Sequence, residues 1–316
     1  MPLYAVPSFA EGAHAGTTLT AEGYLTGTGE WTSPVYTAAQ PFTWAVVSWN
    51  GDGEHLELRV RAKLGSNWSP WFSFGTWSET GAKGSLPKQV VEGVGKLSTD
   101  TLTLAETAVE WQLQAHLQNA TLKRAWLSAA IPAARSNEPA HRAAWGVELP
   151  VPQRSQMIYE GGNVWCSPTS LSMVMAAWGT DLAIPETLVP GVYDPVYEGT
   201  GNWVFNTAYA GSKGFVAWVD RLPGFADLER WVTRGVPVIC SVAYSREWLP
   251  NAVHPYTGGH LLVVRGFTAE GDVICNDPAA STDDGVRVVY RRDLFQRAWL
   301  DRGGVVYLLQ PEGWQG

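Results

Sequence analysis

Hydrophobic and polar residues alternate with a period of two in the first part of the chain. The clearest segments are 56–62 and 109–117, in which every second residue is apolar. This alternation is typical of half-buried antiparallel strands. The stretches NGDG (50–53) and LGSNWSP (64–70) have the composition of turns, and no segment here has a helical period. We therefore predict an all-β sandwich, of jelly-roll or fibronectin-like type, for residues 1–130.

The alternation stops in residues 131–147. This segment is rich in alanine and proline and has no period, so we interpret it as an interdomain linker. A chain of 316 residues is also too long for one ordinary core. We predict a second domain at 148–316.

The second half has a different pattern. Apolar residues at i, i+3, i+4 and i+7 predict a helix that begins at Cys166, and Gly179 is placed to end it. Two shorter helices are predicted at 202–214 and 227–235. The predicted strands that follow are 236–244, 260–267, 272–278, 286–290 and 305–310. Helices followed by an antiparallel sheet indicate an α+β domain.

Charge and hydropathy exclude several classes of partner. The formal net charge is −8, and there is no clustered basic segment, so we expect no nucleic-acid partner. No stretch of 18 apolar residues predicts a membrane span. The N-terminus lacks the pattern of a signal peptide, which predicts a cytoplasmic protein. A secreted or cell-surface protein is the alternative if the true start lies upstream.

The chain has 17 tryptophans and only 9 phenylalanines. Tryptophan as core of the β domain is the favoured interpretation. Exposed tryptophan would instead offer a flat surface to sugars, so a glycan or cell-surface ligand of the first domain is the alternative. Only three cysteines are present, Cys166, Cys240 and Cys275, so a dense disulfide framework is excluded. One bridge between Cys240 and Cys275, or three reduced thiols, both fit the sequence.

Cys166 is the candidate nucleophile, because it lies where the predicted helix begins. A helix N-terminus stabilises a thiolate by roughly 0.3–1 kcal/mol. That is less than the approximately 1.4 kcal/mol that corresponds to one pKa unit. A useful thiolate therefore requires a histidine partner.

Two histidines follow Cys166 in the chain. His254 lies in a loop with proline and glycine, whereas His260 opens an apolar strand and is the better base. A turn near 269–270 would place residue 279, give or take two, opposite His260. Asp277 is then within reach as the acceptor that orients the imidazole, and Asn276, on the other face of the strand, is the alternative.

The oxyanion of an acyl-transfer reaction needs hydrogen-bond donors. The backbone N–H of Cys166 is one candidate, and Gln156 or Gln153 offers a side-chain amide. The pair Gly161 and Gly162 would let the chain turn back toward Cys166. The cysteines and His260 lack the spacing of metal ligands, so we predict no metal and no organic cofactor.

Three segments then resemble one family: VPQRSQMIYEGGNVWCSPTSLSMVMAAWG (151–179), GGHLLVVRGF (258–267) and VICNDPA (273–279). Together they resemble the C39-like branch of papain-type cysteine peptidases, the bacteriocin-processing peptidase superfamily. The resemblance extends over about 148–311 and implies a papain-like fold. Similar bacterial proteins carry an N-terminal β-sandwich.

The resemblance also implies a role for each site residue. It makes Cys166 the nucleophile, His260 the general base and acid, Asp277 its orienter and Gln156 the oxyanion donor. The chain departs from the family pattern at Ser167, where glycine often follows the nucleophile, and in the longer interval between glutamine and cysteine. Members that cut leader peptides are fused to a transporter, so leader-peptide cleavage is not carried over.

We therefore predict a cysteine peptidase that cleaves peptide bonds through a Cys/His/Asp triad and an acyl-enzyme. One alternative is another thiol amidase or an acyl transferase on the same fold. The other is a non-catalytic protein that binds a glycan or a protein and carries a degenerate peptidase domain.

Overall fold

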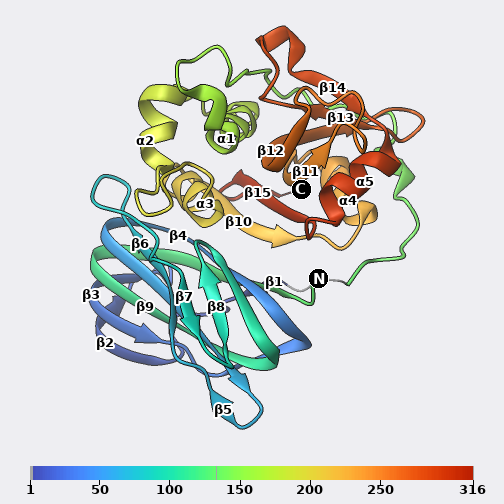
Figure 1. The fold of residues 1–316 in the computed structure, drawn as a ribbon. Coiled ribbons are helices and arrows are strands. Elements are labelled where there is room, and N and C mark those ends of the chain that lie inside the picture. The colour runs from blue at the N-terminus through green and yellow to red at the C-terminus, as the bar shows by residue number, and fades with distance from the viewer. Residues whose placement is uncertain (1–2, 133, 316) are drawn as a thin grey trace. The chain divides into compact units, whose positions relative to one another are not determined.

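The computed structural model describes residues 3–132 and 134–315. It divides into two compact units, drawn in Figure 1. The first comprises 1–132 and 193–219, and the second comprises 133–192 and 220–316. A chain with two units, of which the first is rich in strands, was predicted and is confirmed.

The first unit contains one sheet of nine strands. Its strands are β1 (Leu3–Ala5), β2 (Ala13–Leu19), β3 (Leu25–Thr32), β4 (Tyr36–Leu64), β5 (Asn67–Trp68), β6 (Phe72–Trp77), β7 (Gln89–Val91), β8 (Gly95–Ser98) and β9 (Thr101–Ala130). The long strands β4 and β9 pair with each other in more than one register, which joins all nine strands into a single sheet.

The prediction of a turn at NGDG (50–53) is wrong. These residues lie inside β4, where the register shifts between Asn50 and Gly51. A Cβ on Gly53 would lie 2.4 Å from the Cα of Ala120, so the missing side chain lets β9 pass close by. Glycine here permits an irregularity within a long strand and does not end it.

The core of the first unit accounts for many of its aromatic residues. Four tryptophans are at most 1% exposed: Trp31, Trp49, Trp77 and Trp111. Trp68 and Trp71 are half-buried and both stack against the guanidinium of Arg61. The interpretation of tryptophan as core therefore holds for these four residues.

Residues 193–219 belong to the first unit through buried polar contacts. The amide of Asn50, which is fully buried, donates to the carbonyl of Ala217 at 2.8 Å and accepts from its N–H at 3.1 Å. Helix α3 (Trp203–Ser212) packs on β4 in this unit. Strand β10 (Phe215–Arg221) begins in the first unit and ends in the second.

The second unit combines helices with an antiparallel sheet. Its strands run in the order β15-β11-β12-β13-β14. They are β11 (Val238–Ser245), β12 (Tyr256–Phe267), β13 (Val273–Asn276), β14 (Arg287–Tyr290) and β15 (Val305–Pro311). The helices are α1 (Cys166–Ala177), α2 (Val189–Val192), α4 (Phe225–Thr233) and α5 (Arg292–Leu300), with a π-helical turn at Ile184–Leu188.

Three predicted helices are present as α1, α3 and α4, and the five predicted strands are β11 to β15. Helix α5 and strand β10 were not predicted. Helix α5 (Arg292–Leu300) and strand β10 (Phe215–Arg221) are both short, and neither was recognised from its periodicity. The predicted linker (131–147) contains a 3-10 turn at Arg142–Ala144, and its Trp145 donates to Glu229 at 2.8 Å.

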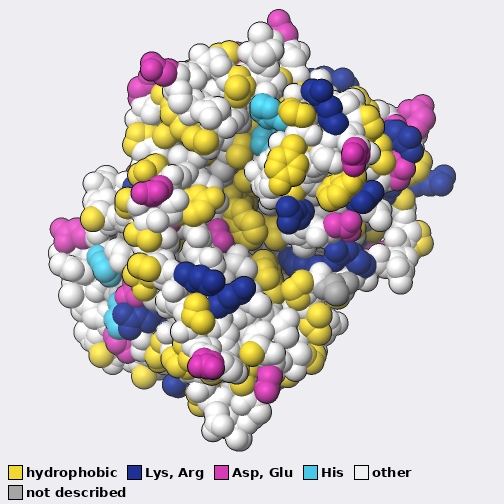
Figure 2. All heavy atoms as spheres, in the orientation of Figure 1, with side chains coloured by type: hydrophobic (Ala, Val, Ile, Leu, Met, Phe, Trp, Pro, Cys, Tyr) yellow, Lys and Arg dark blue, Asp and Glu magenta, His cyan; other side chains and the backbone are white. Residues whose placement is uncertain are grey.

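None of the helices in the described ranges is long and apolar enough to cross a membrane. On the face drawn in Figure 2, acidic and basic side chains are interspersed among hydrophobic ones.

Candidate active site

Cys166 is the first residue of α1, and its side chain is partly exposed. A 3-10 turn at Gly162–Val164 leads into the helix. The carbonyl of Gln156 approaches Gly162 so closely that a Cβ there would lie 1.8 Å from it. The glycine pair therefore allows the chain to fold back just before the nucleophile position.

His260 lies on β12, which packs against α1, and is 5% exposed. Its backbone position is held from the helix, because the hydroxyl of Ser170 on α1 donates to the carbonyl of Leu261 at 3.1 Å. The imidazole and the Cys166 thiol lie close enough for each to shift the pKa of the other. The thiol and the imidazole thus come from two elements that are joined by a hydrogen bond one residue after His260.

The register of β12 and β13 places Asp277 beside His260. Val263 pairs with Asn276 and Val264 with Cys275. Because side chains alternate along a strand, His260 and Asp277 share one face of the sheet and Asn276 points to the other. His260 Nε2 donates to Asp277 Oδ1 at 2.7 Å.

Asn276, the alternative partner of His260, has another role. Its Oδ1 accepts from Arg265 at 3.1 Å, and its Nδ2 donates to the carbonyl of Pro152 at 2.9 Å. It therefore fastens the segment that precedes Gln156. His254, the alternative base, lies in the irregular segment before β12.

Asp277 is fully buried and accepts three hydrogen bonds. Oδ1 accepts from His260 and from the N–H of Ala279, and Oδ2 accepts from the hydroxyl of Tyr290 at 2.8 Å. Tyr290 ends β14 and is also fully buried. Sequence reasoning missed Tyr290. The pairing of β13 with β14 predicts the position of its backbone, but it does not predict which group its hydroxyl contacts.

The charges of these groups stabilise one another. Burial alone would lower the pKa of His260, but the Asp277 carboxylate and the Cys166 sulfur outweigh it and raise that pKa to about 10. Burial would raise the pKa of Cys166, but the hydrogen bond and the charge of His260 lower it below its ordinary value. The pKa of Asp277 is also lowered, because His260 outweighs the cost of burial. This pattern favours a thiolate beside an imidazolium.

The other two thiols have the opposite environment. Cys240 and Cys275 are fully buried on β11 and β13, and burial raises the pKa of each thiol well above its ordinary value. All three cysteines are free. Of the two arrangements that the sequence allowed, the structure has the three reduced thiols.

Gln156 is 2% exposed, and its place is set by the loop after Asp277. Its backbone N–H donates to the carbonyl of Pro278 at 2.8 Å, and its Nε2 donates to the carbonyl of Gly162 at 2.9 Å. An amide nitrogen has two hydrogens, so one remains for another acceptor. Gln153 is exposed and accepts from the N–H of Arg287 instead.

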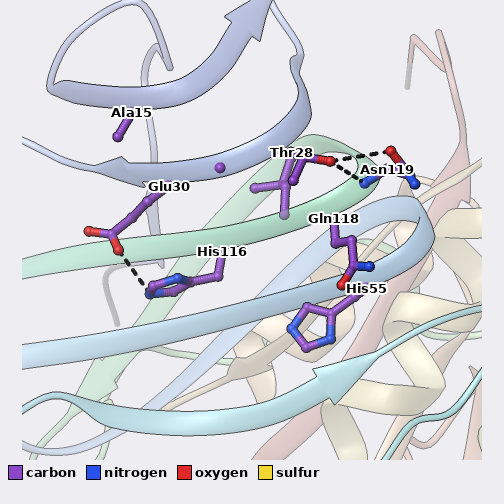
Figure 3. A pocket seen from close by; sticks show the side chains of 9 residues that line it. Ala15, Thr28, Glu30, His55, His116, Gln118 and Asn119 are labelled. Carbon is purple, nitrogen blue, oxygen red and sulfur yellow. Dashed lines mark hydrogen bonds and ion pairs between the residues drawn. The ribbon is translucent and has the colours of Figure 1, made fainter.

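A concave region lies in the first unit. A depression of about 630 Å³ lies where β2, β3, β4 and β9 meet, and Figure 3 shows His55, His116, Glu30, Gln118 and Asn119 around it. Imidazole, carboxylate and amide groups can each bond hydroxyls. Among the described residues that line it there is no tryptophan, tyrosine or phenylalanine.

A thiol, an imidazole and a carboxylate that shift one another's pKa are the side-chain set of thiol hydrolases. Comparison with protein families agrees at the level of the class. Residues 148–307 match the family described as "Peptidase_C39 like family", and the chain belongs to this family of peptidases. Residues 7–131 match the family described as "Peptidase C39 N-terminal domain".

Two solved structures are similar to parts of the chain. One is a protein described as a C39-like peptidase from Bacillus anthracis, with 16% identity, a TM-score of 0.37, and coverage of 52% of this chain and 96% of that one. The other is the Podospora anserina GH26-CBM35 β-(1,4)-mannanase, with 11% identity, a TM-score of 0.24, and coverage of 58% and 46%. No match was found among curated proteins.

Proposed function

We propose that the second unit is a cysteine peptidase of papain-like arrangement, with Cys166 as nucleophile, His260 as base and acid, and Asp277 as the residue that orients His260. The observation that carries the proposal is the buried imidazole of His260, which is bonded to Asp277 at 2.7 Å and lowers the pKa of the Cys166 thiol. Family membership supports a peptidase.

The reaction follows from the placement of charge. The Cys166 thiolate attacks the carbonyl carbon of a peptide, and the tetrahedral oxyanion accepts from the N–H of Cys166 and from the second hydrogen of Gln156 Nε2. The His260 imidazolium then gives its proton to the leaving amine, and the C–N bond breaks. In the second stage, water attacks the thioester and His260 takes the proton from water, after which the C–S bond breaks, the Cys166 thiolate is regenerated and the acid product is released.

The ionisation pattern implies how activity depends on pH. The reactive pair exists above the lowered pKa of Cys166 and below the raised pKa of His260, about 10. Activity should therefore rise through the first value and fall through the second. A pairing in which neither pKa were shifted would give a reactive thiolate only near and above pH 8 to 9.

Alkylation with a thiol reagent, followed by mapping of the adduct, tests the nucleophile. At pH 6.5, Cys166 should react at least about 100-fold faster than Cys240 or Cys275, since it combines partial exposure with a lowered pKa. Cys166→Ala should abolish hydrolysis of a peptide library, whereas Cys275→Ala serves as the matched thiol control. Equal reactivity of the three thiols, or an active Cys166→Ala variant, would overturn the proposal.

An amidase or an acyl transferase would use the same thiol chemistry, and the choice of acyl acceptor and substrate separates these activities from a peptidase. A degenerate domain would show neither alkylation nor hydrolysis.

For the first unit, the depression around His116 is the place where a glycan could bind, and loss of glycan-array binding in a Gln118→Ala variant would test this.

A further inference from the structure

Large hydrophobic side chains that are exposed in the second unit have an unusual distribution. Among the described residues of this unit there are four: Met157 (38% exposed), Ile158 (52%), Val164 (62%) and Tyr256 (70%). Three lie in the segment 157–165 between Gln156 and Cys166. The fourth is four residues before His260 on β12. Grouped exposed apolar residues mark binding surfaces in soluble proteins.

The segment 157–165 is held in a fixed turn. The N–H of Met157 donates to the hydroxyl of Ser155, that of Tyr159 to the carbonyl of Gln156, and that of Gly162 to the carbonyl of Tyr159. The rings of Tyr159 and Trp165 lie 6.3 Å apart at 37°. The exposed side chains are therefore presented by an ordered backbone.

Both ends of this turn belong to the proposed reaction. Gln156, at one end, is the oxyanion donor, and Cys166, at the other end, is the nucleophile. On the strand of the base, Thr257, Gly258 and Gly259 separate Tyr256 from His260, so two of the three intervening residues have no side chain. The segment 157–165 has one charged residue, Glu160, and the segment 256–259 has none.

We propose that the exposed apolar residues of the segments 157–165 and 256–259 contact the substrate, and that the enzyme selects peptides with a large apolar side chain close to the scissile bond. This inference rests on the proposed peptidase function. A polypeptide whose carbonyl carbon reaches the Cys166 sulfur must pass the turn that ends in Cys166. At this turn an apolar side chain of the substrate is removed from water, and so are the side chains of Ile158 and Val164.

Kinetics with matched peptides test the selection. The peptides differ only near the cleaved bond, where they carry leucine, phenylalanine, alanine, lysine or aspartate. For the wild type, kcat/KM for the leucine or phenylalanine peptide should exceed that for the alanine peptide by at least about tenfold, as expected when an apolar pocket gains several methylene groups. Equal kcat/KM for all five peptides would overturn the inference.

The variant Ile158→Ser/Val164→Ser should lower this preference to less than about threefold. The rate of Cys166 alkylation should stay within twofold of the wild type, which shows that the thiol site is intact. Val90→Ser, which changes a valine of similar exposure (64%) in the first unit, is the matched control and should leave the preference unchanged.

The outcomes separate this inference from the function on which it rests. Unchanged preference in the double variant, with normal alkylation, would overturn the substrate contact and leave the peptidase proposal standing. A change in oligomeric state without a change in preference would overturn it too, because the surface would then bind a second copy. Loss of wild-type hydrolysis together with an unreactive Cys166 would overturn both.

Discussion

Two histidines of this protein lie beside a carboxylate, and their environments have opposite effects. His260 Nε2 is 2.7 Å from Asp277, and the two side chains are 6% and 0% exposed. His116 Nε2 is 3.4 Å from Glu30, and these side chains are 27% and 41% exposed. Figure 3 shows this pair in the first unit. Both pairs join an imidazole to a carboxylate, so their surroundings must account for the difference.

Burial by itself would lower the pKa of both imidazoles. At His260 the Asp277 carboxylate and the Cys166 sulfur outweigh burial, and the pKa rises to about 10. At His116 burial and the charge of Arg59 outweigh Glu30 and Glu57, and the pKa is lowered. A histidine beside a carboxylate thus becomes a strongly held cation only where solvent is excluded and no competing cation lies nearby.

The largest effect is expected from Asp277→Asn, which keeps the shape of the side chain and removes its charge. We expect kcat/KM to fall by about 100-fold to 10,000-fold, since the imidazolium loses its counter-ion and its orienting acceptor. The alkaline limit of activity should move down from about 10, because Asp277 raises the pKa of His260. A full pH profile of peptide hydrolysis measures both.

The matched control for Asp277→Asn is Glu30→Gln, which makes the same change in the exposed pair. It should leave the pH profile of hydrolysis unchanged. Similar profiles for Asp277→Asn and the wild type would remove Asp277 from the mechanism.

The next effect is expected from Tyr290→Phe. The ring would keep its stacking on Phe295, at 6.2 Å and 19°, and the hydroxyl bond to Asp277 would be lost. A hydrogen bond to a charged group contributes about 1.5–3 kcal/mol, so kcat should fall by about tenfold or more with little change in KM.

Tyr307→Phe removes a buried hydroxyl that bonds the neutral Ser167 and serves as the control for Tyr290→Phe. Its kcat should change by less than about threefold, on the scale of a neutral hydrogen bond that does not touch the triad. If both variants lose kcat equally, the hydroxyl of Tyr290 has no special link to Asp277.

Asp100 allows a second comparison, between two buried carboxylates whose pKa values shift in opposite directions. It is buried in the first unit and accepts from the N–H of Trp203 at 2.7 Å. Burial, together with the charge of Asp194, outweighs its hydrogen bonds and raises its pKa from 3.8 to about 6. Asp277 is also buried, but beside His260 its pKa is lowered.

A raised pKa means that the folded state binds more protons than the unfolded state between pH 3.8 and about 6. Stability should therefore fall as pH rises through this window. Asp100→Asn, which stays neutral, should raise the free energy of unfolding at pH 7.5 by about 1–2 kcal/mol, part of the roughly 3 kcal/mol that the shift represents. Denaturant unfolding at pH 4 and pH 7.5 measures the effect, and a gain of equal size at both values would contradict it.

The smallest effect is expected from His116→Gln. Partly exposed ion pairs contribute about 0–1 kcal/mol, so the free energy of unfolding should change by less than about 1 kcal/mol, with no change in hydrolysis. A loss of hydrolysis comparable with that of Asp277→Asn would show that the pair in the first unit acts on catalysis. The conclusion that only His260 takes part in hydrolysis would then be wrong.

Much of the fold could be predicted, because local patterns carry it. Period-two alternation identified a strand-rich first part, and i, i+3, i+4 spacing identified α1 with its start at Cys166. The hairpin estimate for the strands of His260 and Asp277 agrees with the observed pairing of Val263 with Asn276. The length of β4 was missed, since a glycine-rich stretch can bend a strand as well as end it.

The sequence by itself determined the two parts of the chain, the candidate residues Cys166, His260, Asp277 and Gln156, and the side of the strand on which Asp277 lies. Only the tertiary structure decided that residues 193–219 belong with the first unit and that Tyr290 bonds Asp277. Tertiary structure also determined which thiol has a lowered pKa. Periodicity reports which face of an element is buried, whereas pKa and hydrogen bonding depend on atoms that distant segments bring to within about 3 Å of each other.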